Sequence, residues 1–131
     1  MILLDTHIVI WLASSESKRL SHRAVAAIDS AREEHGGLAI SAVSLYEIAM
    51  LAAKGRIALR TSMESFLDKV ETQFVIKPIT SRICAETTRL PDAYPSDPMD
   101  RLIGATAIVE GLTLVTADVA IQKAKAVPTL W

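Results

Sequence analysis

Short apolar runs alternate with helix-forming stretches along this sequence, and this alternation constrains the fold more than any other feature. Each run has three to five residues and is bounded by polar or turn-forming residues, as is typical of strands buried on both faces of a sheet. The runs are Ile2-Leu3-Leu4, Leu38-Ala39-Ile40, Phe74-Val75-Ile76 and Leu112-Thr113-Leu114-Val115-Thr116. Strands separated by helices usually pair in parallel, so the pattern predicts an α/β/α sandwich around a central parallel sheet.

The helices expected between these strands are recognised from their caps and apolar stripes. Ser21 and Thr80 are predicted N-caps, and either Ser41 or Ser44 is expected to begin another helix. The expected helical ranges are 8–13, 22–35, 41–55, 63–72, 80–90, 98–110 and 119–123, with a polar loop at 14–17 and an extended piece at 127–131. The chain has 131 residues and no internal repeat, so we expect one domain spanning residues 1–131.

The overall composition excludes several classes of protein. The formal net charge is −1 with neutral histidines, so no global basic field would draw the chain to nucleic acid. Cys84 is the only cysteine, which excludes an intrachain disulfide and a cysteine-based zinc site, and we expect it to be a small core residue. The first residues lack a basic segment, and no apolar run has the length of a membrane span. We therefore expect a cytoplasmic protein that does not insert into a membrane.

The stretch Ser96-Asp97-Pro98-Met99-Asp100-Arg101 predicts the start of a helix. Asp97 is suited to be the N-cap, and proline is pre-set for the first helical position. Asp100 then lies in the first turn, where free N–H groups and the helix dipole favour a negative charge. The stretch therefore places an acid at a helix N-terminus.

Four acids are expected to meet at one edge of the predicted sheet. Asp5 follows the first strand and Asp118 follows the last well-defined one, while Glu47 and Asp100 lie in the first turns of helices. In an open parallel sheet, strand C-termini and helix N-termini share the edge where ligands bind. Each acid also has an alternative interpretation as a cap, and Ser44 with Glu47 has the spacing of a capping box.

Carboxylates gathered in one cleft repel one another, and this repulsion raises some of their pKa values. A bound divalent cation is the simplest way to neutralise the repulsion. Oxygen donors suit Mg²⁺ or Mn²⁺ rather than zinc, because the sequence has no histidine and cysteine set at ligand spacing. Such a cation activates water and stabilises charge at phosphorus. The acids therefore predict metal-dependent phosphodiester hydrolysis.

Several basic and aromatic residues have two open interpretations. His7 is assigned a structural role in preference to a substrate contact, and Arg101 is equally suited to a phosphate or to a nearby acid. Lys54 and Arg56 are assigned to the end of a helix in preference to a contact with a nucleic-acid backbone. Core packing and a groove for a partner helix both remain open for Trp11, Tyr46 and Met50.

The order and spacing of these motifs resemble the PIN domain family, and in particular the VapC-type toxins of bacterial toxin–antitoxin pairs. The motifs are Leu3-Leu4-Asp5-Thr6-His7, Ser44-Leu45-Tyr46-Glu47-Ile48, Asp97-Pro98-Met99-Asp100-Arg101 and Thr116-Ala117-Asp118. The resemblance spans essentially the whole chain. It implies a PIN fold, a Mg²⁺- or Mn²⁺-dependent endoribonuclease acting on RNA, a cognate antitoxin partner and frequent homodimerisation.

The resemblance also implies roles for individual residues. The family's metal-binding and catalytic quartet is matched by Asp5, Glu47, Asp100 and Asp118. The accessory positions are Thr6, Asp97, Arg101 and Thr116, of which the two threonines match hydroxyl residues often found beside the acids. Met99 departs from the pattern, since an aromatic residue is common there, and this change should affect packing more than chemistry.

Two other classes of function remain as alternatives. The same acids would serve another metal-dependent phosphodiesterase or a DNA nuclease, because the preference for RNA comes from the resemblance alone. A non-catalytic regulatory module is less favoured. A phospho-receiver would carry an acidic pair near the first strand and a lysine after a late strand, whereas here a single acid and Thr116-Ala117-Asp118 stand in those places.

Overall fold

The sheet is parallel throughout and lies at the centre of the molecule. The computed structural model describes residues 1–14, 16–34 and 36–131. In these ranges the strands β1 (Ile2–Leu4), β2 (Leu38–Ser41), β3 (Val75–Lys77), β4 (Leu114–Val115) and β5 (Thr129–Leu130) form one sheet. Their order across the sheet is β3-β2-β1-β4-β5, and every neighbouring pair is parallel. The predicted parallel sheet is confirmed, and the C-terminal extended piece adds β5 at its edge.

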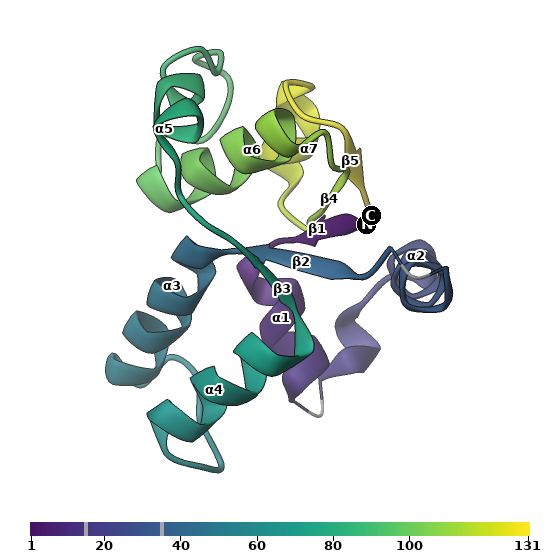
Figure 1. Cartoon of the computed structure of the whole chain (residues 1–131), viewed down its shortest axis with the longest axis vertical. Helices are drawn as coiled ribbons and strands as arrows, with labels where there is room; N and C mark the ends of the chain where they lie inside the picture. The colour runs from purple at the N-terminus through teal and green to yellow at the C-terminus, as the bar shows by residue number, and fades with distance from the viewer. Residues whose placement is uncertain (15, 35) are drawn as a thin grey trace.

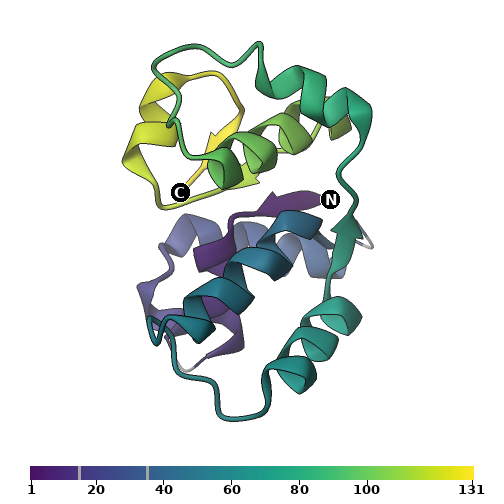
Figure 2. The same cartoon turned by 90° about the vertical axis from the view of Figure 1, so that its left-hand side faces the viewer.

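Helices cover both faces of the sheet. They are α1 (Thr6–Ala13), the short 3-10 helix η1 (Ser17–Arg19), α2 (His22–Glu33), α3 (Ala42–Ala53), α4 (Met63–Gln73), α5 (Ser81–Thr87), α6 (Pro98–Glu110) and α7 (Val119–Ala124). The first four α-helices lie on one side of the sheet and α5, α6 and α7 on the other (Figure 1), and the rotated view agrees (Figure 2). The α/β/α sandwich is therefore confirmed. None of the helices in the described ranges is long and apolar enough to cross a membrane.

Successive strand residues pack into two separate hydrophobic cores, one on each face of the sheet. Leu4 and Val115 belong to the apolar cluster under α1 to α4, whereas Leu3 and Leu114 belong to the cluster under α6 and α7. This two-sided burial explains why the strands are continuous apolar runs, because successive side chains of a strand point to opposite faces.

Several predicted boundaries were displaced by local hydrogen bonding. α1 begins at Thr6 rather than Ile8, because Asp5 caps it directly after β1. α5 ends at Thr87 rather than Leu90, since the backbone continues with i to i+3 bonds from Thr88 and Arg89. α2 ends at Glu33. Glu34 is its C-cap, and the predicted helix end at His35 and the loop position Ser15 lie outside the described residues.

Two sequence interpretations were wrong. Of the two N-caps left open for α3, Ser41 is the one observed, and its hydroxyl accepts a hydrogen bond from the Val43 amide. Ser44 therefore lies inside the helix, so Ser44 and Glu47 do not form a capping box. Cys84 is exposed rather than a core residue, because α5 turns Ile83 inward and the next position faces solvent.

Candidate active site

The sheet order reverses between β1 and β4, and the C-terminal ends of these two strands meet there. The chain leads from β1 to β2 and β3 on one side, and β4 and β5 lie on the other side. Asp5 follows β1 and its amide donates to the Val115 carbonyl at 3.0 Å. Thr116 follows β4, and Asp118 comes two residues later. Crevices at such reversal points are where open parallel sheets bind ligands.

Asp5 is the best-anchored acid of this crevice, with only 8% of its surface exposed. Its Oδ1 accepts the Thr6 amide at 2.8 Å, and its Oδ2 accepts the Thr116 hydroxyl at 2.7 Å. The Thr116 oxygen accepts in turn from the Asp118 amide at 3.1 Å. These bonds join the ends of β1 and β4 to the start of α7, so two threonines predicted as accessory residues contact this network.

Glu47 reaches the crevice from α3. Beneath it, the Thr6 hydroxyl donates to the Ser44 hydroxyl oxygen at 2.9 Å, which links α1 to α3. The Glu47 Oε1 atom is buried and has no hydrogen-bond partner among the described residues. A buried acceptor without a partner is costly unless something absent from the protein chain satisfies it.

The other acids stand at helix N-termini. Asp97 caps α6, accepting the amides of Met99 at 2.8 Å and Asp100 at 3.3 Å with its Oδ1. Asp100 lies in the first turn of that helix, as predicted, and is half-buried. Asp118 caps α7 through its Oδ1. The capping interpretations of Asp5, Asp97 and Asp118 are therefore correct.

All four predicted acids line a single cleft of about 360 Å³. The lining residues are Asp5, His7, Trp11, Glu47, Asp97, Asp100, Ala117 and Asp118. His7 is exposed, and its ring lies 6.1 Å from that of the buried Trp11. The Trp11 ring also lies 6.0 Å from the Trp131 ring and 4.5 Å from the Arg19 guanidinium carbon. Sequence reasoning did not place Trp11 or Ala117 at this cleft. Ala117 was recognisable from its position between Thr116 and Asp118.

Burial and mutual repulsion disfavour the charged forms of these acids. Burial raises the pKa of Asp5, although the hydrogen bond from Thr116 opposes that shift. Burial raises the pKa of Glu47 and the Asp5 charge adds to this, although Thr6 and His7 partly oppose the shift. Burial, followed by the charges of Asp5 and Asp97, raises the pKa of Asp100 to about 7. The cleft is therefore an environment that a cation would stabilise.

The sequence profile of the PIN domain matches residues 2–127. The chain belongs to the PIN domain family. It is 42% identical over 117 residues to Ribonuclease VapC22 of Mycobacterium tuberculosis, covering 89% of this chain and 86% of that protein. The resemblance found in the sequence is confirmed.

Solved structures share the fold of this PIN domain. VapBC2 from Rickettsia felis, bound to a promoter DNA fragment, matches with a TM-score of 0.72 and 18% identity over 99% of this chain and 98% of that one. A toxin–antitoxin complex from Klebsiella pneumoniae matches with a TM-score of 0.67 and 21% identity over 100% and 97% of the two chains.

The donors of this PIN domain fit a hard divalent cation by their chemistry. The acids offer only carboxylate oxygens, and the Glu47 Oε1 atom lacks a partner. Within the described ranges, no three histidine, cysteine or acidic side chains already converge on one point as a ready-made metal site.

Arg101 lies outside this cleft. Its guanidinium donates to the carbonyl oxygens of Thr87 and Tyr94, both at 3.3 Å. The ion pairs found in the described parts of the chain do not include it. Arg101 therefore contacts backbone rather than an acid in this structure.

Proposed function

We propose that this chain is a metal-dependent endoribonuclease toxin that a cognate antitoxin neutralises. The observation that carries the proposal is the meeting of Asp5, Glu47, Asp100 and Asp118 in one cleft of a PIN domain. The 42% identity to a protein named as a ribonuclease supports RNA as the substrate. We take residues 1–131 as one catalytic domain, acting in the cytoplasm where RNA is accessible.

In this proposal the four acids hold Mg²⁺ or Mn²⁺. The chemistry that the cation would supply is activation of water and neutralisation of charge developing at phosphorus. Asp5 is held by Thr116 and the Thr6 amide, so it is the most rigid of the four ligands. Asp100 lines the same cleft from the first turn of α6.

Glu47 and Asp118 complete the set. The Glu47 Oε1 atom has no hydrogen-bond partner among the described residues, so it is suited to accept a hydrogen bond from a water molecule and orient it. Asp118 uses Oδ1 for its helix, and its Oδ2 remains available to the cation or to a water. Attack by water needs no 2′-hydroxyl, so we expect products with 5′-phosphate and 3′-hydroxyl ends.

A partner antitoxin and a homodimer belong to the same proposal. Structures similar in fold include one named as a toxin–antitoxin complex, which supports a proteinaceous inhibitor. Co-expression with the product of a short neighbouring reading frame, followed by co-purification and light scattering, tests both points.

The function is tested with purified wild type and the Asp100→Asn variant. We expect wild type to cleave single-stranded RNA oligonucleotides with Mg²⁺ and not with EDTA, and Asp100→Asn to remain folded but lose cleavage and growth arrest. Asp92→Asn is the matched control, because Asp92 is an exposed acid preceding the same helix. Equal cleavage by wild type and Asp100→Asn would refute the role of Asp100.

Substrate class is decided in the same assay. Single-stranded DNA and a simple phosphate ester are offered in parallel with RNA, and preferential cleavage of RNA is expected. Cleavage of DNA or of the ester at the same rate would overturn the assignment as a ribonuclease. Products with 2′,3′-cyclic phosphate ends would contradict hydrolysis by a water molecule.

A further inference from the structure

The connection from α5 to α6 delivers two of the acids to the cleft without being a helix or strand itself. It runs from residue 88 to residue 97 and is mostly exposed. Two side chains in it are buried, Leu90 at 7% exposure and Tyr94 at 1%. A segment of this kind needs fixed contacts if the helix that follows it is to hold a carboxylate in a defined place.

Tyr94 makes such contacts on the first turns of α6. Its hydroxyl donates to the Asp100 carbonyl oxygen at 3.0 Å, which ties the phenol to the backbone of the acid itself. The ring also lies against Gly104, where an added Cβ would overlap the hydroxyl and come within 2.7 Å of the Tyr94 Cζ. Glycine is unfavourable inside a helix, so its presence here is explained by the close approach of Tyr94.

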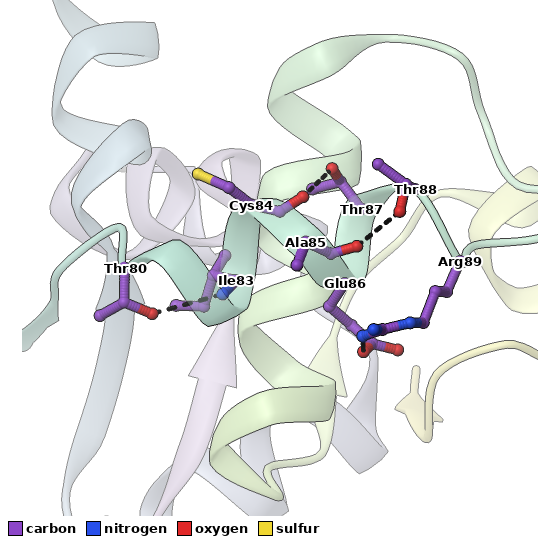
Figure 3. A network of polar contacts seen from close by, with 8 residues as sticks. All are labelled: Thr80, Ile83, Cys84, Ala85, Glu86, Thr87, Thr88 and Arg89. Carbon is purple, nitrogen blue, oxygen red and sulfur yellow. Dashed lines mark hydrogen bonds and ion pairs between the residues drawn. The ribbon is translucent and has the colours of Figure 1, made fainter.

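Arg101 fastens the same connection from the neighbouring position. One guanidinium nitrogen donates to the Thr87 carbonyl at the end of α5, and another donates to the Tyr94 carbonyl. Figure 3 shows the last turn of α5, where the hydroxyls of Thr87 and Thr88 donate to the carbonyls of Cys84 and Ala85. The Thr87 carbonyl is thus left to Arg101, whose positive charge is favourable at a helix C-terminus.

We propose that Tyr94, Arg101 and Gly104, here called the Tyr94 anchor, are positioning residues that fix the first turn of α6 and so aim the Asp100 carboxylate into the cleft. Two of the anchor's bonds flank that carboxylate, one on the carbonyl of Asp100 and one from the side chain of the next residue. The part of this proposal that concerns cation binding rests on the proposed function.

The first test is the order of the α6 first turn in the metal-free protein. Tyr94→Phe removes the hydroxyl and keeps the ring. We expect amide hydrogen exchange at residues 101–104 to quicken about three- to tenfold, the effect of one net hydrogen bond. Arg101→Lys, which cannot reach two carbonyls with a planar fork, should act in the same direction. Arg89→Ala is the matched control, because Arg89 is exposed and forms its ion pair with Glu86 of α5 (Figure 3).

The second test is Mn²⁺ binding, followed by the electron spin resonance of the free ion, with the melting temperature recorded beside it. We expect Tyr94→Phe and Arg101→Lys to weaken Mn²⁺ binding about three- to tenfold and Arg89→Ala to leave it within twofold of wild type. The Mg²⁺ concentration that gives half-maximal cleavage should rise in parallel. A structural role alone would lower the melting temperature without moving either quantity.

The outcomes separate the two proposals. Unchanged exchange at 101–104 in both variants would refute the anchor, whatever the cation does. If both variants bind Mn²⁺ as tightly as wild type, the proposed effect of the Tyr94 anchor on Asp100 is refuted. The nuclease proposal is unaffected by that result. Wild type that neither binds Mn²⁺ nor cleaves RNA would refute the proposed function, and the exchange result would still decide whether the anchor orders the helix.

Discussion

The carboxylate of Asp100 should destabilise the metal-free fold, and removing its charge should therefore raise stability. Burial and the surrounding acids raise its pKa from an ordinary 3.8 to about 7. The folded protein thus binds this proton more tightly than the unfolded chain does. Stability is consequently lost as pH rises from about 4 to about 7, and the full penalty is present above that window. Asparagine at position 100 has nearly the same side-chain shape but no charge, so it avoids this loss of stability.

The size of the effect follows from the shift. One pKa unit corresponds to about 1.4 kcal/mol, so the shift sets an upper limit of about 4 kcal/mol. Asp100 is only half-buried, and solvent screening reduces this figure to about 2 kcal/mol. The variant also loses a negative charge that is favourable at the N-terminus of α6, which reduces the gain in stability by about 0.5 kcal/mol. A net gain of about 1.5 kcal/mol corresponds to roughly 5 °C in a chain of this length.

Thermal unfolding in EDTA measures this directly. At pH 8 Asp100→Asn should melt roughly 5 °C above wild type, at pH 4 the two should coincide, and Asp92→Asn should follow wild type throughout. Adding Mg²⁺ should stabilise wild type more than the variant and narrow or reverse the gap. A variant that melts at or below wild type at pH 8 in EDTA would refute the reasoning, and so would a gap of equal size at both pH values.

Two further changes test the supports of the cleft. Thr116→Val removes the hydroxyl that donates to Asp5, so it should lower the free energy of unfolding in urea by about 1–3 kcal/mol and abolish most RNA cleavage. Thr116→Ser keeps the hydroxyl and should retain both stability and cleavage. A valine variant as stable as wild type would contradict a stabilising role for this hydrogen bond. Asp97→Ala removes the cap of α6 and should lower the free energy of unfolding by about 1 kcal/mol. Asp97→Ser can still cap the helix and should lose much less stability. Identical denaturation midpoints for the alanine and serine variants would show that the cap contributes little.

Much of the fold was accessible from the sequence because backbone rules determine it. Two-sided burial makes each strand a continuous apolar run, and the caps at Ser21, Asp97 and Thr80 were identified from their side chains and confirmed. The gathering of the acids was also predictable, because strand C-termini and helix N-termini of a parallel sheet share an edge.

The wrong and the undecided interpretations concern positions where tertiary contacts decide the outcome. Ser41 and Ser44 are both plausible caps, and the choice depends on where β2 ends. Cys84 has apolar neighbours, but only the docking of α5 decides which side of that helix is buried. The contacts of Arg101 with two backbone carbonyls leave no trace in the sequence around it, because their acceptors are main-chain atoms.

The capping and ligand roles of the acids are not exclusive, and the hydrogen bonds show how they combine. Asp97 and Asp118 each cap a helix with Oδ1, which fixes the rotamer and leaves Oδ2 to the cleft. Asn retains the accepting oxygen of such a cap and lacks the charge, whereas Ala lacks both, so Asn and Ala variants separate the two roles at these positions. Asp100 and Glu47 cap none of the described helices, and burial opposes their charges. At Asp100 burial and the surrounding acids all raise the pKa, whereas Thr6 and His7 partly oppose that shift at Glu47, so a bound cation should matter most to Asp100.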